Sequence, residues 1–213
     1  MSNFPLAARH IQPHIFPVVI VAIVILIALV GADAQQILRY QRPSIFAGEV
    51  WRLLTAHFVH LGWGHLLMNL VALGLIWGLA GRALRTSAWL VISLARMAGV
   101  SAGLLIFSPA LEWYVGLSGM LHGLFLAGIM ANLAAPVHPC THSICASCTA
   151  RAGHRLEIIL LLALCGKVAW EQLNGPLPGS AEFAGGAVIV DAHFYGLVGG
   201  LAGVLPYLLA RKP

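Results

Sequence analysis

The chain has 213 residues, of which 60% are apolar and only 9% are charged. This composition excludes a soluble globular domain and indicates an integral membrane protein. The net charge of +5 does not indicate nucleic-acid binding, because the arginines stand singly at the ends of apolar runs, where basic residues fix membrane orientation. The apolar runs are too long for the strands of a membrane barrel and do not alternate, so we expect transmembrane helices.

Six apolar runs follow one another in a single domain, without a linker or an internal repeat. We therefore expect an all-α membrane protein, with a six-helix bundle over residues 15–210 between a cytoplasmic segment (1–14) and a cytoplasmic tail (211–213). The first run could instead be a cleaved signal peptide, because Ala32-Asp33-Ala34 resembles a cleavage site. Its length and the five later runs favour a span. The expected spans are residues 15–30, 64–79, 87–107, 117–132, 156–173 and 187–210.

The segments between these runs set the expected orientation. Residues 31–63 mix charged and apolar residues and suit the membrane interface. Residues 174–186 are rich in Gly and Pro and predict a loop. We expect both termini in the cytoplasm, because the basic residues then gather on the inner face. That face would hold Arg9, Arg82, Arg85, Arg151, Arg155, Arg211 and Lys212.

Polar residues stand at the outer ends of three of the expected spans. Ser118 opens the fourth span, and a serine at membrane depth is either a packing residue or a functional one. His65 and Asn69 are four residues apart and share one face at the start of the second span. They could bond a neighbouring helix or point to a common site. His193 lies in the first turns of the sixth span.

Small residues predict that the fourth and sixth spans pack closely enough to bring Ser118 and His193 together. They are Gly119, Gly123 and Ala127 on one span, and Gly196, Gly199, Gly200 and Gly203 on the other. A histidine beside a serine can remove the hydroxyl proton and create a nucleophile. Asp191 is two residues from His193 and does not share its helix face, so we expect a Ser118/His193 dyad without a carboxylate. His65, Asn69 and the backbone N–H of Ser118 would form an oxyanion hole.

Four short motifs together resemble the rhomboid family of intramembrane serine proteases. They are Trp51-Arg52, His65-x-x-x-Asn69 with His60 before it, Gly116-x-Ser118-Gly119, and Ala192-His193-x-x-Gly196. The resemblance implies the Ser118/His193 dyad, the His65 and Asn69 oxyanion hole, and cleavage of membrane proteins without a metal or cofactor. Gly116, Gly119 and Gly196 would support the site. His122, one turn after Ser118, either takes the place of an aromatic residue that packs on the catalytic histidine or is itself the base.

Within that family the chain looks most like the rhombosortases, because of its compact core and its Leu117-Ser118-Gly119-Met120-Leu121-His122-Gly123 sequence. This closer resemblance implies that the partners are membrane-anchored proteins with a C-terminal Gly-Gly motif, one transmembrane helix and a basic tail. It also implies a multi-pass protein of a bacterial inner membrane. The competing functions are a catalytically idle relative that binds membrane clients, and a small transporter.

A few residues lie outside this scheme. The cytoplasmic loop at 133–155 contains Cys140, Cys145 and Cys148 beside histidines, which could ligate zinc or form an unliganded insertion. Arg96 is in the middle of the third span and must face the bundle. Lys167 and Glu171 are four residues apart and could pair. We expect Cys165 to be a core residue.

Overall fold

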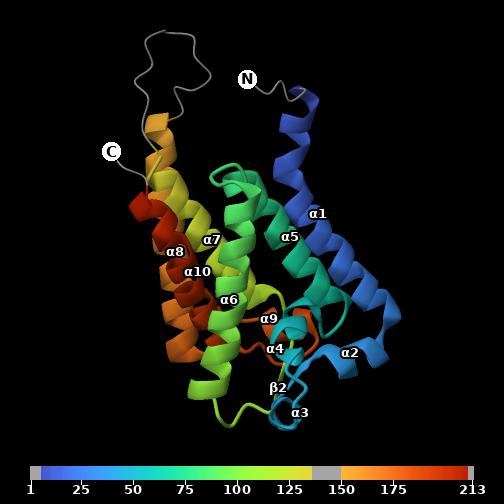
Figure 1. The fold of residues 1–213 in the computed structure, drawn as a ribbon. Coiled ribbons are helices and arrows are strands. Elements are labelled where there is room, and N and C mark those ends of the chain that lie inside the picture. The colour runs from blue at the N-terminus through green and yellow to red at the C-terminus, as the bar shows by residue number, and fades with distance from the viewer. Residues whose placement is uncertain (1–5, 136–149, 211–213) are drawn as a thin grey trace.

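The computed structural model describes residues 6–135 and 150–210, with side chains described for 14–135 and 154–210. Each of the six expected apolar runs forms a long helix, and these helices make one bundle (Figure 1). α1 begins at Leu6, well before the expected first span, and the other helices match their runs to within a few residues at most ends. The long helices are α1 (Leu6–Val30), α5 (Trp63–Ala80), α6 (Thr86–Phe107), α7 (Ser118–Leu133), α8 (Ala150–Asn174) and α10 (Val190–Ala210).

Short elements gather at one end of the bundle, opposite the end where α1 begins and α10 ends (Figure 1). The interfacial stretch between α1 and α5 folds into α2 (Ala32–Leu38), β1 (Tyr40–Gln41), α3 (Arg42–Phe46), α4 (Arg52–Thr55) and the 3-10 turn η1 (Ala56–Phe58). β1 pairs antiparallel with β2 (Trp113–Tyr114), which leads into α7. The Gly- and Pro-rich loop before α10 contains one short helix, α9 (Ser180–Ala184).

Several of these helices are long and apolar enough to cross a membrane, as the composition predicts. By length and composition, α5, α6 and α10 qualify among the described residues, and α1 with α2 makes a fourth candidate bent by 116°. Large apolar side chains such as Leu67, Leu75 and Leu94 are exposed on the outside of the bundle, as lipid-facing residues would be. α7 is apolar but shorter, and ten of its 16 residues are buried. The chain is therefore an integral membrane protein built around α7.

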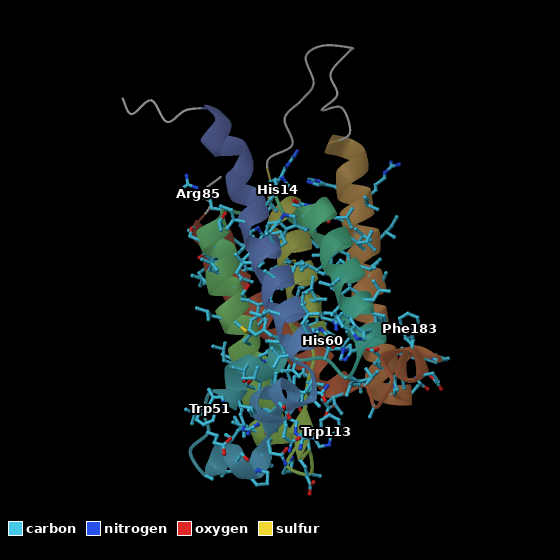
Figure 2. All side chains as sticks on the ribbon, turned by 90° about the vertical axis from the view of Figure 1, so that its right-hand side faces the viewer. His14, Trp51, His60, Arg85, Trp113 and Phe183 are labelled. Atoms are coloured by element: carbon cyan, nitrogen blue, oxygen red, sulfur yellow. The ribbon has the colours of Figure 1, made fainter. Side chains whose placement is uncertain are left out.

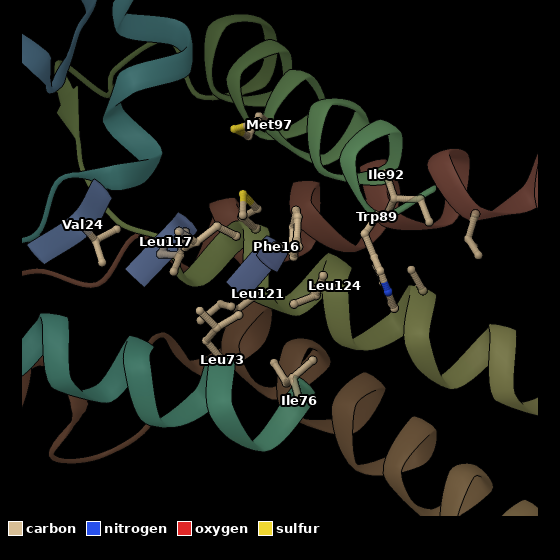
Figure 3. Close-up of a cluster of buried hydrophobic side chains, with 14 of the residues drawn as sticks. Phe16, Val24, Leu73, Ile76, Trp89, Ile92, Met97, Leu117, Leu121 and Leu124 are labelled. Atoms are coloured by element: carbon tan, nitrogen blue, oxygen red, sulfur yellow. The ribbon is translucent and has the colours of Figure 1, made fainter. Parts of the chain in front are cut away.

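The main hydrophobic core surrounds α7 and reaches from α1 to α10 (Figure 3). Leu121 and Leu124 of α7, and Leu117 directly before this helix, are almost fully buried in it. Phe16 stacks on Trp77 with ring centroids 5.3 Å apart, so α1 and α5 are tied together at one side of this core.

α7, α6 and α10 approach one another through glycines. A Cβ atom at Gly196 of α10 would lie 1.9 Å from the carbonyl oxygen of Gly119 on α7, so any larger residue would force the two helices apart. A Cβ at Gly199 would meet the backbone of α6 at Ala95 and Arg96 within 2.8 Å. The predicted packing is confirmed for Gly196 and Gly200, which face Gly119 and Gly123 of α7. Gly199 and Gly203 lie on the adjacent face of α10 and pack on α6, which the sequence did not predict.

Candidate active site

Ser118 is the first residue of α7, at the positive end of the helix dipole. The turn before it requires glycine at position 116, where φ is +137°, a conformation that other residues rarely adopt. A Cβ there would also lie 3.0 Å from Cε1 of His65 and 3.7 Å from Oγ of Ser118. Gly116 therefore allows the ring of His65 and the hydroxyl of Ser118 to face the same point.

His193 lies in the first turn of α10, with Nε2 3.0 Å from Oγ of Ser118. The two residues are 75 positions apart in the sequence. The Gly119–Gly196 contact brings them together, because it is one residue after Ser118 on α7 and less than one turn after His193 on α10. The predicted proximity of the serine and the histidine is present in the structure.

A carboxylate stands behind His193, contrary to the expectation of a dyad without one. Oε2 of Glu171, on α8, is 2.8 Å from Nδ1 of His193. Asp191, the nearest acid in the sequence, instead accepts a hydrogen bond from Ser108 Oγ at 2.8 Å. The only sign of Glu171 in the sequence was an acid in an apolar run paired with Lys167. Nothing in the spacing showed that this face of α8 turns toward α10.

Lys167 links Glu171 to His122. Its Nζ is 2.7 Å from Oε1 of Glu171, which confirms the predicted pair, and 3.0 Å from Nε2 of His122. Because an ammonium group only donates, Nε2 of His122 accepts and its Nδ1 carries the proton. That Nδ1–H donates to the carbonyl oxygen of Ser118 at 2.7 Å.

The ring of His122 stacks on that of His193, with centroids 4.0 Å apart and an interplanar angle of 17°. Neither ring nitrogen of His122 contacts the hydroxyl of Ser118, because both are engaged elsewhere. Of the two histidines considered as the base, His193 is the one placed at Oγ, and His122 occupies the stacking position.

His65 and Asn69 approach Ser118 from α5, on another side of the serine. The backbone N–H of Leu61 donates to Nδ1 of His65 at 3.3 Å, so Nε2 of this ring carries the proton and can donate. The side-chain amide nitrogen of Asn69 is buried and has no hydrogen-bond partner within the described part of the chain. Buried donors without partners are uncommon in proteins. The amide of Asn69 can therefore donate to a group bound beside Ser118.

A cavity of about 460 Å³ opens between α5, α7 and α8 and reaches Ser118. Its wall is almost entirely apolar; the polar exceptions are Asn69, Ser118, His122 and Lys167. The apolar part of the wall consists of Ala72, Leu75, Ile76, Leu79, Leu121, Phe125, Leu160, Ala163 and Leu164. An apolar chain segment could therefore lie in the cavity with a peptide bond beside Ser118.

The segment between α1 and α5 is held together by Arg52. Its guanidinium bonds Glu49 at 2.6 Å and the carbonyl oxygens of Gln36 and Arg39 at 2.9 Å. Close by, the carbonyl of His60 accepts a hydrogen bond from Gln35. Burial, and then the adjacent ring of His65, lower the pKa of His60 to about 3, so this histidine is neutral. Figure 2 shows Trp51 and Trp113 at this end of the molecule and His14 and Arg85 at the other.

One group of side chains in the described ranges has the spacing of a metal site. Potential ligand atoms of His122, Glu171 and His193 lie within 4.8 Å of one another. The ammonium of Lys167 already bonds two of these three residues, and its charge opposes a metal cation. The geometry therefore favours a hydrogen-bonded network over a metal centre.

The other residues that the sequence analysis considered are Arg96 and the cysteines. Arg96 is fully buried and donates to Ser93 Oγ one turn earlier, so it faces the bundle as expected. Cys165 is exposed on α8, and the expectation of a core residue was wrong, because that face of the helix turns away from the bundle. The possible zinc ligands Cys140, Cys145 and Cys148 lie outside the described residues.

The chain matches the model of a known protein family. A family model described as Rhomboid domain matches residues 47–210, from the segment before α4 to the end of α10. A search of curated proteins gave no match to the chain.

Proposed function

The chain belongs to the rhomboid family of intramembrane serine proteases, and from this premise we propose that it is an active endopeptidase with Ser118 as nucleophile and His193 as base. The observation that carries the proposal is the 3.0 Å distance between Nε2 of His193 and Oγ of Ser118. A hydrogen bond of this length allows the proton to pass to the ring as the oxygen attacks. An idle relative would have no need to keep the pair in bonding geometry.

The reaction follows from this arrangement in two steps. Ser118 Oγ attacks the substrate carbonyl carbon while its proton passes to Nε2 of His193, and that proton then goes to the leaving amine. Water, deprotonated by the same nitrogen, next releases the acyl group from the serine. In both steps the carbonyl oxygen becomes negatively charged. His65 Nε2–H, the Asn69 amide and the backbone N–H of Ser118 are donors that would stabilise it.

The depth of the site suggests where a substrate is cut. At 1.5 Å per residue, the 16 residues of α7 extend about 24 Å, less than the hydrocarbon core of about 30 Å. Ser118 would then lie just inside the outer surface. A substrate helix must unwind there to expose its carbonyl, and glycine in a helix costs about 1 kcal/mol relative to alanine. We therefore propose cleavage at small residues near the outer end of a C-terminal transmembrane helix, as in rhombosortase-like processing at Gly-Gly.

The proposed topology has all six long helices crossing a bacterial inner membrane, with both termini in the cytoplasm. α1 begins and α10 ends at the same end of the bundle, which supports this arrangement (Figure 1). The opposite end, with Ser118, β2 and the elements between α1 and α5, would then face outward. A reporter that works only in the cytoplasm should be active when it is fused at Pro213. Activity at Pro213 of a reporter that works only outside the cytoplasm would contradict the topology.

The function is tested with purified protein in liposomes and a single-span substrate that has Gly-Gly at the outer end of its helix. Wild-type protein should release the outer domain, and Ser118→Ala should not. Ser87→Ala is a matched control, because Ser87 is exposed near the start of α6. Cleavage that survives Ser118→Ala would overturn the proposal. Replacing the small residues of the substrate with Leu should slow the cut, and unchanged cleavage would overturn the proposed specificity.

A further inference from the structure

The carboxylate behind His193 has no place in a two-residue mechanism. We infer that Glu171 is a positioning residue, which with Lys167 holds His193 in the tautomer that can accept the proton of Ser118. The inference rests on the proposed protease function and adds a requirement to it. A closed ring of hydrogen bonds supports it, and this ring runs through Ser118, His193, Glu171, Lys167 and His122.

The direction of every bond in this ring is fixed by its two ionic members. The Lys167 ammonium can only donate, and the Glu171 carboxylate can only accept. Nδ1 of His193 must therefore carry a proton and donate it to Oε2 of Glu171, at 2.8 Å. Nε2 is then unprotonated and accepts the Ser118 hydroxyl at 3.0 Å. The other branch ends at Ser118 as well, because His122 Nδ1–H donates to its carbonyl oxygen.

Burial isolates the two central members of this hydrogen-bonded network from water. The side chain of Glu171 is 2% exposed and that of His193 is 5% exposed, so water cannot supply alternative partners. A hydrogen bond in such a low-dielectric site is electrostatically stronger than in water. When Nε2 takes the serine proton, the imidazole of His193 becomes an imidazolium cation that is hydrogen-bonded to the Glu171 carboxylate. Glu171 stays ionised throughout, and no proton leaves Nδ1.

Lys167 has a separate role, which is to balance the negative charge of Glu171. Its Nζ is 2.7 Å from Oε1, the carboxylate oxygen that does not contact His193. A buried carboxylate with His193 as its one partner would favour a protonated ring before any substrate arrives. A protonated ring cannot act as a base. With Lys167 in place, the carboxylate is neutralised while His193 stays neutral.

The first variant to test is Glu171→Gln, which keeps the shape of the side chain. Lys167 still requires an acceptor, so the Gln oxygen turns to Lys167 and the Gln NH₂ turns to Nδ1 of His193. That NH₂ donates, so Nδ1 loses its proton and Nε2 gains one, which is the wrong tautomer for accepting the serine proton. We expect kcat to fall by about 10²-fold or more, within the range for loss of general base catalysis, with little change in KM.

The matched control is Glu157→Gln on the same helix. Glu157 is also a buried acid, and its Oε1 accepts a hydrogen bond from the amide of Asn132 at 2.6 Å. It lies 14 residues from Glu171, about 21 Å along α8 at 1.5 Å per residue. The control should keep the wild-type kcat. If removing any buried carboxylate from α8 impaired the enzyme, kcat would fall equally in both variants. That result would overturn the assignment.

The double variant Lys167→Met/Glu171→Gln gives the sharpest kinetic test. Without the ammonium, the Gln side chain is free to turn its oxygen to Nδ1 and restore the productive tautomer. We expect the double variant to have a higher kcat than Glu171→Gln alone. A merely structural role for Glu171 predicts the opposite, since two changes in one hydrogen-bonded network would be worse than one. A double variant no faster than the single one would contradict the inference.

The unaltered chain provides a test that does not depend on how the variants fold. In ¹⁵N-histidine NMR of the full-length protein in detergent near neutral pH, His193 should be protonated at Nδ1 and not at Nε2. The opposite tautomer would overturn the inference. So would a wild-type kcat for Glu171→Gln while Ser118→Ala is inactive, and in that case the protease function would stand. If Ser118→Ala remains active, Ser118 is not the nucleophile, and the proposed serine protease mechanism fails together with the inference.

Discussion

The two sides of Ser118 differ in how completely their polar groups are bonded. Toward α8 and α10, His193, Glu171, Lys167 and His122 form a closed set of partners. Toward α5, the amide nitrogen of Asn69 is buried with no hydrogen-bond partner among the described residues. The closed side is already organised in the free protein, whereas the open side holds a donor for a charge that arises only during the reaction. Such preorganised donors favour the transition state over the substrate.

Replacing Ser118 or the histidine bonded to it should have the largest effect on cleavage. Ser118→Ala and His193→Ala should each abolish cleavage while the protein still folds in detergent, because one removes the nucleophile and the other the base. The double variant should be no slower than either single variant, since the two residues act as one unit. Losses that add up, measured by substrate release in liposomes, would mean that they act independently.

Removing donors from the open side should have an intermediate, graded effect. His65→Ala and Asn69→Ala should each lower kcat by about 10²–10³-fold, the usual cost of losing one oxyanion donor. Phosphonate labelling of Ser118 should slow in these variants but continue, because the nucleophile and base remain. Full activity in both variants would show that the open side is structural and that the backbone alone stabilises the oxyanion.

The smallest expected effect is a change of pH dependence in Lys167→Met. Removing a positive charge beside Glu171 makes a proton on His193 more favourable, so the ring becomes charged at a higher pH. The pH of half-maximal rate on the acidic side should therefore move upward, with a modest loss of kcat at alkaline pH. A pH–rate profile of the purified variant measures this. A downward shift of this pH, or no shift, would show that the charge of Lys167 does not affect the protonation of His193.

Much of the fold and part of the site could be predicted from the sequence, for identifiable reasons. Gly119 and Gly196 showed which helices approach closely, and Ser118 and His193 each precede one of these glycines on its own helix. His65 and Asn69 followed from their spacing on one face. Glu171 could not be placed, because its partner His193 is on another helix and the turn of α8 about its axis depends on packing. The folding of residues 31–63 into short helices and a strand also depended on distant contacts, such as the β1–β2 pairing.

The role of His122 was open in the sequence for a similar reason. Its position one turn after Ser118 allowed either contact with the hydroxyl or stacking on His193. The structure places Lys167 at one ring nitrogen and the Ser118 carbonyl at the other. That choice depends on α8, and no pattern within α7 could show it.

We propose that the Ser118 hydroxyl is a nucleophile activated by the residues of the closed side. The most direct measurement is the rate of fluorophosphonate adduct formation, with the modified residue mapped by mass spectrometry, in wild type, Glu171→Gln and Glu157→Gln. We expect one adduct, on Ser118, formed much more slowly in Glu171→Gln and at the wild-type rate in Glu157→Gln. No adduct in the wild type, an adduct on another residue, or equal rates in all three proteins would contradict it.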